Sequence, residues 1–455
     1  MKKVHFIGIL GTGMSSLALY CHESGYLVSG SDIKDTHDPS LPSWLDNKYY
    51  KNKLNHNFIN QADYIVYSTA ISKDHPELVY ANEQKKNILH RSELINLISA
   101  NKHVISIAGT HGKTTTSAFT AWLFNKNHLN PSFLIGGTPS NLSSAKYNKG
   151  NHIILEADES DGSFLNYRTD TCVITNIEPD HLENHDNSFE NYLNSFKDFI
   201  EGCQTCIYNF HDKYTSSLVK DIKNTVFYSF GYSQDVDFKI IYVEPNDLTQ
   251  TIKIQTPDQK IHKFETQLQG KYNAENAVSA WIIGYLNDIH DEKLAKSTQS
   301  FEGVKRRCEI IGHINIDSNA KIPILDDYGH HPTECNAVIK EFKRQDKNII
   351  HIFQPHRYSR LTNFFDEFCN TLKESDVLLV QDVFTAGENK ENRKDAYDLI
   401  NKIKKYHPNV FHAKDTQTIV SIVNKFVDNN SIILFQGAGS VSQTAHECAN
   451  LWKQN

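Results

Sequence analysis

The chain has 455 residues and a formal net charge of −7, a length that suits two to four domains with substantial cores. The negative balance gives no general support for a nucleic-acid partner, and no apolar run approaches the roughly 20 residues of a membrane-spanning helix. The eight cysteines are scattered, and their one CxxC, at Cys203 and Cys206, favours core thiols over a zinc or redox site and fits a reducing cytoplasm.

The first predicted element is a strand over residues 3–9, followed by a glycine turn and a helix that reaches residues 20–24. Its apolar run meets Gly8 and Gly11 too soon for a signal peptide. A second strand over residues 26–29 leads to Asp32, an acid that could bind a ribose hydroxyl. This pattern is typical of a nucleotide-binding βαβ unit, and NAD is a competing ligand for it.

A second α/β unit begins with the apolar strand Val104–Ala108, which leads through a glycine loop into a helix over residues 117–125. Glycines let backbone N–H groups close around phosphate oxygens, and the helix start adds positive potential. Lys113 adds a full charge, and the Thr114 hydroxyl is a ligand of the kind that Mg²⁺ takes. The pattern predicts a nucleotide phosphate site made of Gly109, Thr110, His111, Gly112, Lys113, Thr114 and Thr115.

Two further strands of this unit end in polar residues, at the edge where α/β sheets hold their ligands. The strand over residues 152–155 runs into four carboxylates, of which we favour Glu156 as a metal ligand. The strand over residues 171–175 is followed by Asp180 and His181. His181 is therefore a candidate for a metal or phosphate role.

Residues 201–264 read as short strands and loops without legible chemistry. A helix then opens within residues 270–280, where Asn273 and Asn276 lie one turn apart. One of these amides could contact a base while the other caps the helix. The alternative is a helix-packing motif with no ligand.

A third α/β unit is expected after the basic stretch 301–307, and we place a domain boundary there. Its strands also end in polar residues, DDYGHHPTE after residues 322–325 and QPHRYSR around residues 354–360. A positive cleft at this edge would suit carboxylate and phosphate groups. Four arginines would supply the charge: Arg306, Arg307, Arg357 and Arg360.

These motifs together resemble the Mur ligase family. The resemblance runs along nearly the whole chain in family order, through the early glycine loop with Asp32, GTHGKTTT at 109–116, EADESDGSFL at 156–165, TNIEPDHLE at 175–183, GKYNAENAVSA at 270–280, FEGVKRR at 301–307, DDYGHHPTE at 326–334 and QPHRYSR at 354–360. It implies an α/β fold with three domains. These are a Rossmann-like UDP-sugar-binding domain (1–99), a central P-loop ATPase-type domain (100–303) and a Rossmann-like amino-acid-binding domain (304–455).

The resemblance also implies roles for single residues. Loop 109–115 would hold the phosphates of ATP, with Lys113 on the β- and γ-phosphates. Thr114 and Glu156 would bind one Mg²⁺, His181 would bind a second, and Asn273 and Asn276 would lie at the adenine. Four residues would close on the acceptor sugar and the amino acid: Arg306, Arg307, His330 and Arg357. The UDP-sugar would lie against Gly11, Thr12, Gly13, Met14, Ser15 and Asp32, although Leu10, Thr12 and Ser16 depart from the smaller residues usual in the family.

The implied activity is ATP-dependent amide formation between UDP-N-acetylmuramate and L-alanine in peptidoglycan precursor synthesis. His330 is the candidate base for the amine, and Arg357 a candidate to stabilise the oxyanion. The enzyme would act as a monomer or homodimer, without nucleic acid or membrane insertion. Three rivals remain: a recycling ligase that attaches a tripeptide to the same sugar, a nicotinamide-dependent oxidoreductase that uses the first glycine loop, and a mechanical or regulatory ATPase.

Overall fold

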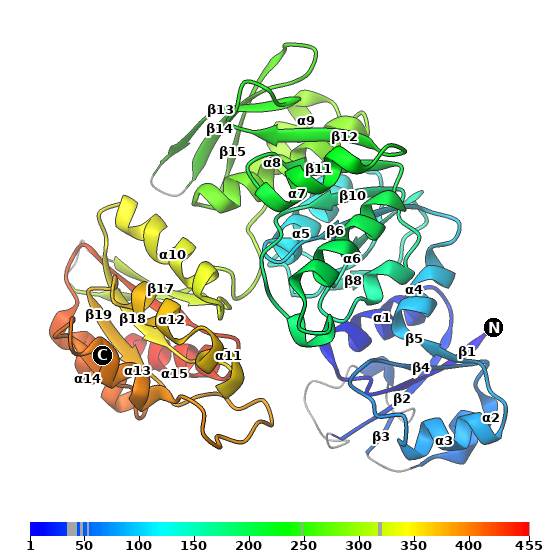
Figure 1. Cartoon of the computed structure of the whole chain (residues 1–455), viewed down its shortest axis with the longest axis horizontal. Helices are drawn as coiled ribbons and strands as arrows, with labels where there is room; N and C mark the ends of the chain where they lie inside the picture. The colour runs from blue at the N-terminus through cyan, green and yellow to red at the C-terminus, as the bar shows by residue number, and fades with distance from the viewer. Residues whose placement is uncertain (34–42, 46–48, 52–53, 247–248, 317–320, 455) are drawn as a thin grey trace. The chain divides into compact units, whose positions relative to one another are not determined.

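The computed structural model describes residues 1–33, 43–45, 49–51, 54–246, 249–316 and 321–454, and it shows an α/β protein built on three sheets (Figure 1). The chain divides into two compact units, Met1–Gly303 and Val304–Asn455, and the first unit contains two of the sheets. The three-part α/β fold confirms the predicted fold class. The exact domain limits 99/100 and 303/304 stay predictions.

The first sheet has five parallel strands in the order β3-β2-β1-β4-β5. The strands are β1 Lys3–Ile7, β2 Leu27–Asp32, β3 Tyr49–Lys51, β4 Tyr64–Tyr67 and β5 Ile88–His90, and the helices are α1 Thr12–Glu23, α2 His56–Gln61, α3 Pro76–Glu83 and α4 Arg91–Ser99. β1 ends at Ile7, two residues earlier than predicted, because Gly8 turns the chain with a φ of 76°. The strand order reverses beside β1, which is where such sheets bind ligands.

The second sheet has ten strands in the order β15-β14-β13-β12-β11-β10-β6-β9-β7-β8. Its parallel centre consists of β6 His103–Ala108, β7 Ser132–Leu134, β9 His152–Glu156, β10 Thr171–Ile174, β11 Thr205–Asn209 and β12 Val226–Gly231, with β8 Ala145–Lys146 antiparallel at one end. The helices of this part are α5 Lys113–Lys126, α6 Phe189–Glu201, α7 Lys213–Leu218, α8 Lys271–Leu286 and α9 Asp291–Gln299. β6 lies between β10 and β9, so the loops after these three strands meet at one edge.

Two predictions for this region need correction. α5 begins at Lys113, not at residue 117, because the β-branched residues Thr114–Thr116 are buried and packing overrides their low helix propensity. Residues 201–264 contain short strands, as predicted, but also a helix, α7, that the sequence analysis does not predict. They contain β11, β12, α7 and a ribbon of β13 Phe238–Pro245, β14 Gln250–Gln255 and β15 Ile261–Thr266, which extends the sheet with antiparallel pairs.

The third sheet lies in Val304–Asn455 and has the order β16-β17-β21-β18-β19-β20. It consists of the antiparallel edge strand β16 Glu309–Asn315 and five parallel strands, β17 Lys321–Asp327, β18 Asn348–Phe353, β19 Val377–Val380, β20 Val410–His412 and β21 Ser431–Gln436. The helices are α10 Pro332–Arg344, α11 Tyr358–Asn363, α12 Phe365–Leu372, α13 Ala396–Ile403, α14 Thr416–Phe426 and α15 Val441–Gln454.

The cysteines behave as the sequence predicts. Cys203 and Cys206 are free, buried thiols in the apolar core of the first unit. Among the described residues, no helix is both long enough and apolar enough to cross a membrane.

Candidate functional site

Gly112 shapes the loop between β6 and α5. Its φ of 85° lies in the left-handed region that favours glycine. A Cβ on Gly112 would lie 2.5 Å from Oδ1 of Asn276, so a larger residue would displace the side chain of Asn276 on α8. α5 begins directly after Gly112 and has no acidic residue in its first turn. The free N–H groups and partial positive charge of this helix end therefore suit an anion.

Lys113 is held by its own loop and by the acidic segment 156–161 at the end of β9. Its Nζ donates to the carbonyl oxygens of Gly109 at 2.6 Å and Thr110 at 3.1 Å, and it lies 2.8 Å from Oε2 of Glu159. Burial raises the pKa of Glu159 to about 7, although the neighbouring ammonium opposes this shift. Glu159 was not singled out from the sequence, where it is one of four carboxylates in a row of six residues.

Thr114 and Glu156 lie together, as a shared metal ion would require. The Thr114 hydroxyl donates to Oε1 of Glu156 at 2.8 Å, and the backbone N–H of Gly136 donates to Oε2 at 2.7 Å. Glu156 ends β9, and Thr114 lies in the first turn of α5, which follows the neighbouring strand β6. The parallel pairing of β6 and β9 therefore brings a hydroxyl and a carboxylate to one point.

The other predicted nucleotide and metal residues surround this loop. Asn276 is buried against Gly112, and its Nδ2 lies 3.5 Å from Oδ1 of Asn273. Asn273 also donates to the carbonyl oxygen of Gln269 at 2.8 Å. His181 lies in the loop after β10, with a φ of 53° and its Nε2 3.6 Å from Oδ2 of Asp180.

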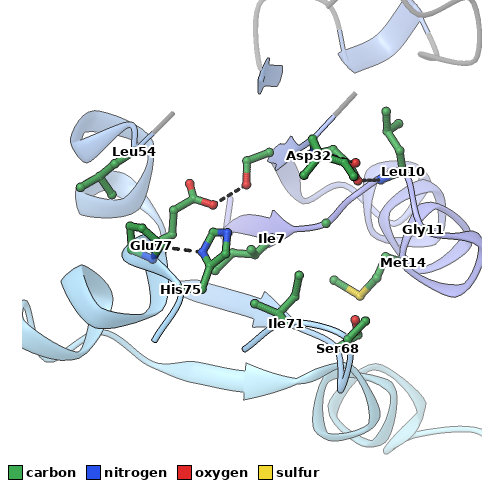
Figure 2. A pocket seen from close by; sticks show the side chains of 15 residues that line it. Ile7, Leu10, Gly11, Met14, Asp32, Leu54, Ser68, Ile71, His75 and Glu77 are labelled. Carbon is green, nitrogen blue, oxygen red and sulfur yellow. Dashed lines mark hydrogen bonds between the residues drawn. The ribbon is translucent and has the colours of Figure 1, made fainter. Parts of the chain in front are cut away.

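A separate pocket of about 430 Å³ opens at the carboxyl edge of the first sheet (Figure 2). Of the residues predicted to bind the UDP-sugar, Gly11, Met14 and Asp32 line it. Oδ2 of Asp32 accepts from the backbone N–H of Leu10 at 2.9 Å, so this acid holds the glycine turn in place. The remaining three, Thr12, Gly13 and Ser15, lie in the first turn of α1 outside the lining.

Sequence reasoning missed the polar side of this pocket. Ser31, His75 and Glu77 all line it. Glu77 accepts a hydrogen bond from the Ser31 hydroxyl and lies 3.4 Å from Nε2 of the fully buried His5. The sequence around residue 75 predicts only a helix start, which α3 confirms, because an acid in a first helical turn is common for local reasons.

In the C-terminal unit, the two arginines of the FEGVKRR motif both contact Tyr328. Their guanidinium carbons lie 4.8 Å (Arg306) and 5.1 Å (Arg307) from the ring centroid. Nη2 of Arg306 also donates to the carbonyl oxygen of Gly437 at 2.7 Å. Arg357 is exposed and has a φ of 69°, whereas Arg360 is buried with Nη1 3.5 Å from Nδ1 of His356. Of these four arginines, Arg357 is the most accessible to a ligand.

His330 is a neutral imidazole in this fold. Its Nδ1 lies 3.0 Å from the carbonyl oxygen of Tyr328, and because a carbonyl only accepts, Nδ1 carries the hydrogen. Burial lowers the pKa of His330 to about 3. Nε2 is therefore the acceptor nitrogen. His331 instead caps α10, where its side chain accepts from the backbone N–H of Thr333 at 3.4 Å.

The C-terminal unit is expected to lose stability as pH falls below neutrality. Burial lowers the pKa of His330 and of His351 to about 3, and that of His356 to about 4. Unfolded histidine has a pKa near 6.5, so between about pH 6.5 and pH 4 the unfolded chain binds more protons than the folded chain. The contribution of these groups is thus complete above pH 6.5 and is lost on acidification.

Hydrogen exchange of peptides from β18 and β21, corrected for intrinsic rates, measures this effect. Protection should fall between pH 7 and pH 4.5, and His351→Gln should flatten the fall because His351 is fully buried. The matched change His446→Gln, at an exposed histidine of α15, should leave the slope as in the parent protein. Equal protection at both pH values would contradict the assignment of these histidines as neutral.

Three family models match the chain in succession. The Mur ligase family catalytic domain matches residues 3–103, the Mur ligase middle domain matches residues 107–284, and the glutamate ligase domain of Mur ligases matches residues 306–439. The UDP-N-acetylmuramate–L-alanine ligase of Buchnera aphidicola subsp. Acyrthosiphon pisum is 34% identical, over 98% of this chain and 94% of that protein. The chain belongs to the Mur ligase family. This confirms the resemblance seen in the sequence and makes the protein a member of a family of ATP-dependent ligases.

Further Mur ligases agree with this assignment. The UDP-N-acetylmuramate–L-alanine ligase of Dictyoglomus turgidum is 33% identical over 97% of this chain and 95% of its own length. The crystal structure of the UDP-N-acetylmuramate-alanine ligase MurC of Thermotoga maritima matches with a TM-score of 0.81 at 23% identity, over the full length of both chains. A murein peptide ligase of Psychrobacter arcticus matches with a TM-score of 0.68 at 19% identity, over 100% of this chain and 99% of that chain. The two structures show a shared Mur ligase fold.

Proposed function

We propose that this Mur ligase joins L-alanine to the lactyl carboxylate of UDP-N-acetylmuramate and converts ATP to ADP and phosphate, in peptidoglycan precursor synthesis. The observation that carries the proposal is the similarity over nearly the full chain to relatives named for this reaction. The phosphate loop with Lys113 and the Thr114–Glu156 pair support the ATP-dependent half of the chemistry.

An amide does not form from a carboxylate and an amine at neutral pH, because the carboxylate oxygen is a poor leaving group. In the proposed route, a lactyl carboxylate oxygen attacks the γ-phosphorus of ATP, the bond to ADP breaks, and an acyl phosphate forms. The alanine nitrogen then attacks the acyl carbon. Phosphate leaves with the bonding electrons, and the nitrogen loses a proton.

The first step brings two anions together, so its main requirement is positive charge at a fixed position. Lys113 supplies a full charge, and the backbone N–H groups after Gly112 supply partial charges at the start of α5. Because Nζ of Lys113 is already held by two loop carbonyls, little reorganisation is needed when phosphates bind. Lys113 is therefore the residue to which we assign the largest part of the electrostatic effect.

The donor set around Glu156 fits Mg²⁺, a hard cation that prefers oxygen ligands. We propose that the Thr114 hydroxyl and the Glu156 carboxylate hold one Mg²⁺ and that His181 holds a second. Bound there, Mg²⁺ would offset the negative charge of the ATP phosphates. Asn273 and Asn276 are proposed to lie at the adenine, from the start of α8.

The C-terminal unit is proposed to receive the acceptor and the amino acid. Arg357 would bind a carboxylate or stabilise the oxyanion, and Arg306 and Arg307 would hold the loop around Tyr328. With its lowered pKa, His330 is a weak base. Its Nε2 is better suited to accept a hydrogen bond from the attacking amine, which orients the nitrogen while the proton passes to solvent or phosphate.

Two rival functions remain useful as outcomes of a test. A ligase for a whole tripeptide shares the fold, as the likeness to the murein peptide ligase shows. An oxidoreductase would use the pocket of the first sheet and leave the phosphate loop without a role. We place the reaction in the cytoplasm, which suits the eight free cysteines of the chain.

The experiment that tests the proposal is ADP release by the purified protein with UDP-N-acetylmuramate and a panel of amino acids, together with the tripeptide. L-alanine should give the fastest release, and release should require the UDP-sugar. ADP release with UDP-N-acetylmuramate and the tripeptide, but not with L-alanine, would assign the recycling reaction. ATP turnover that ignores the UDP-sugar would remove the proposed function, and NAD binding without ADP release would favour the oxidoreductase.

A further inference from the structure

Arg91 is a partly buried cation beside the start of α1. It is the first residue of α4, which follows β5, and its side chain is only 18% exposed. Nη1 lies 3.2 Å from the position that a Cβ would occupy on Gly13. A guanidinium from one helix therefore reaches the first turn of another, close to backbone N–H groups that have no acidic residue beside them.

The contacts that hold Arg91 are long. Nη2 lies 3.5 Å from Oδ2 of Asp158, 3.6 Å from Oδ2 of Asp161 and 3.4 Å from Oγ of Ser163. Both carboxylates also have closer donors, because Asp161 accepts from the Thr69 hydroxyl at 2.6 Å and Asp158 accepts from a backbone N–H at 3.1 Å. Within the described part of the chain, Nη1 has no hydrogen-bond acceptor. The Arg91 side chain is thus held in place by Nη2, while the N–H groups of Nη1 can donate to a ligand.

The pocket at the carboxyl edge of the first sheet also reaches the start of α1. It is lined by Gly11, which precedes α1, by Met14 in the first turn of α1, and by apolar side chains that include Ile71 (Figure 2). A nucleoside in this pocket would bring its 5′-diphosphate to the start of α1. Helix N-termini favour anions, and arginine binds phosphate through two parallel N–H groups.

We infer that Arg91 binds the diphosphate of the UDP-sugar, an assignment that rests on the proposed function. Arg91 would act with the first-turn N–H groups of α1, and Asp158 and Asp161 would orient its guanidinium toward them. The sequence gives no sign of this role. His90-Arg91-Ser92-Glu93 reads only as a helix start, and α4 indeed has a capping box there.

The test measures UDP and UDP-N-acetylmuramate binding by calorimetry on the full chain without ATP. Arg91→Gln should raise the Kd for UDP by about 10- to 100-fold, the usual effect of losing a charged hydrogen bond, and Arg91→Lys should lie between. The Kd of the parent protein should rise more steeply with salt than that of Arg91→Gln. The matched control is Arg168→Gln. The Arg168 side chain is 56% exposed and pairs with Asp170, so this variant should bind UDP as the parent does.

A structural role for Arg91 predicts a different result. Asp158 lies in the field of both Arg91 and Lys113, so disruption of the acidic turn would weaken ATP binding as well. Our inference requires that the KM for ATP and the thermal midpoint of Arg91→Lys stay close to the parent values. The inference would be overturned if both Arg91 variants bound UDP as tightly as the parent protein. It would also be overturned if they lost affinity for UDP and for ATP by the same factor. Failure of the parent protein to bind either uridine nucleotide would remove the proposed function itself.

Discussion

Replacement of Lys113 by alanine is expected to lower kcat/KM for ADP release by about a thousandfold or more. Lys113 supplies the only full positive charge that its loop carries, and its Nζ is already fixed by the carbonyl oxygens of Gly109 and Thr110. A steady-state assay with saturating UDP-N-acetylmuramate and L-alanine measures the effect.

The variant also leaves Glu159 buried without its ammonium, which can lower stability for a reason unrelated to catalysis. The double change Lys113→Ala with Glu159→Gln separates the two effects. It should recover the thermal midpoint and remain inactive. Lys126→Ala, at the exposed far end of α5, should keep near-parent activity. Near-parent turnover by Lys113→Ala would refute the phosphate-loop assignment.

Replacement of Glu156 by glutamine is expected to lower kcat/KM by more than about a hundredfold and to raise the Mg²⁺ concentration needed for half-maximal rate. Glutamine keeps the shape of the side chain and one acceptor oxygen for the Thr114 hydroxyl or the Gly136 N–H. The charge that would bind the metal is lost. A Mg²⁺ titration of the initial rate gives both quantities.

The matched control is Glu201→Gln, at an exposed glutamate that lies 3.9 Å from Lys197 on α6. Surface pairs of this kind contribute little, so its rate and Mg²⁺ dependence should match the parent. If Glu156→Gln behaved in the same way as this control, Glu156 would not be a metal ligand.

The sequence was most informative where chemistry follows directly from topology. The residue pattern predicts that Thr114 and Glu156 each lie just after a strand of an α/β sheet, and the family resemblance implies that they share one metal ion. The parallel pairing of β6 and β9 supplies what the sequence does not encode, namely that the two strands are neighbours. The sequence predicts that α5 starts at residue 117, four residues late. Thr114–Thr116 have low helix propensity, and only their burial explains why the helix includes them.

Other parts of the site depend on contacts between distant residues, which no local pattern encodes. The lowered pKa of His330 arises from burial in the folded unit, and the ion pair of Lys113 with Glu159 depends on how the acidic turn folds back over the loop. Arg91 and Glu77 both occur in ordinary helix starts, so their positions beside α1 and under the pocket appear only in three dimensions.

In the proposed mechanism, ATP activates the lactyl carboxylate as an acyl phosphate before the amide forms. The most direct measurement uses UDP-N-acetylmuramate with ¹⁸O in the lactyl carboxylate and analyses the released phosphate by mass spectrometry. An acyl phosphate intermediate transfers one carboxylate oxygen to phosphorus, so we expect one ¹⁸O atom in each phosphate released with product. Product formed together with unlabelled phosphate would contradict it.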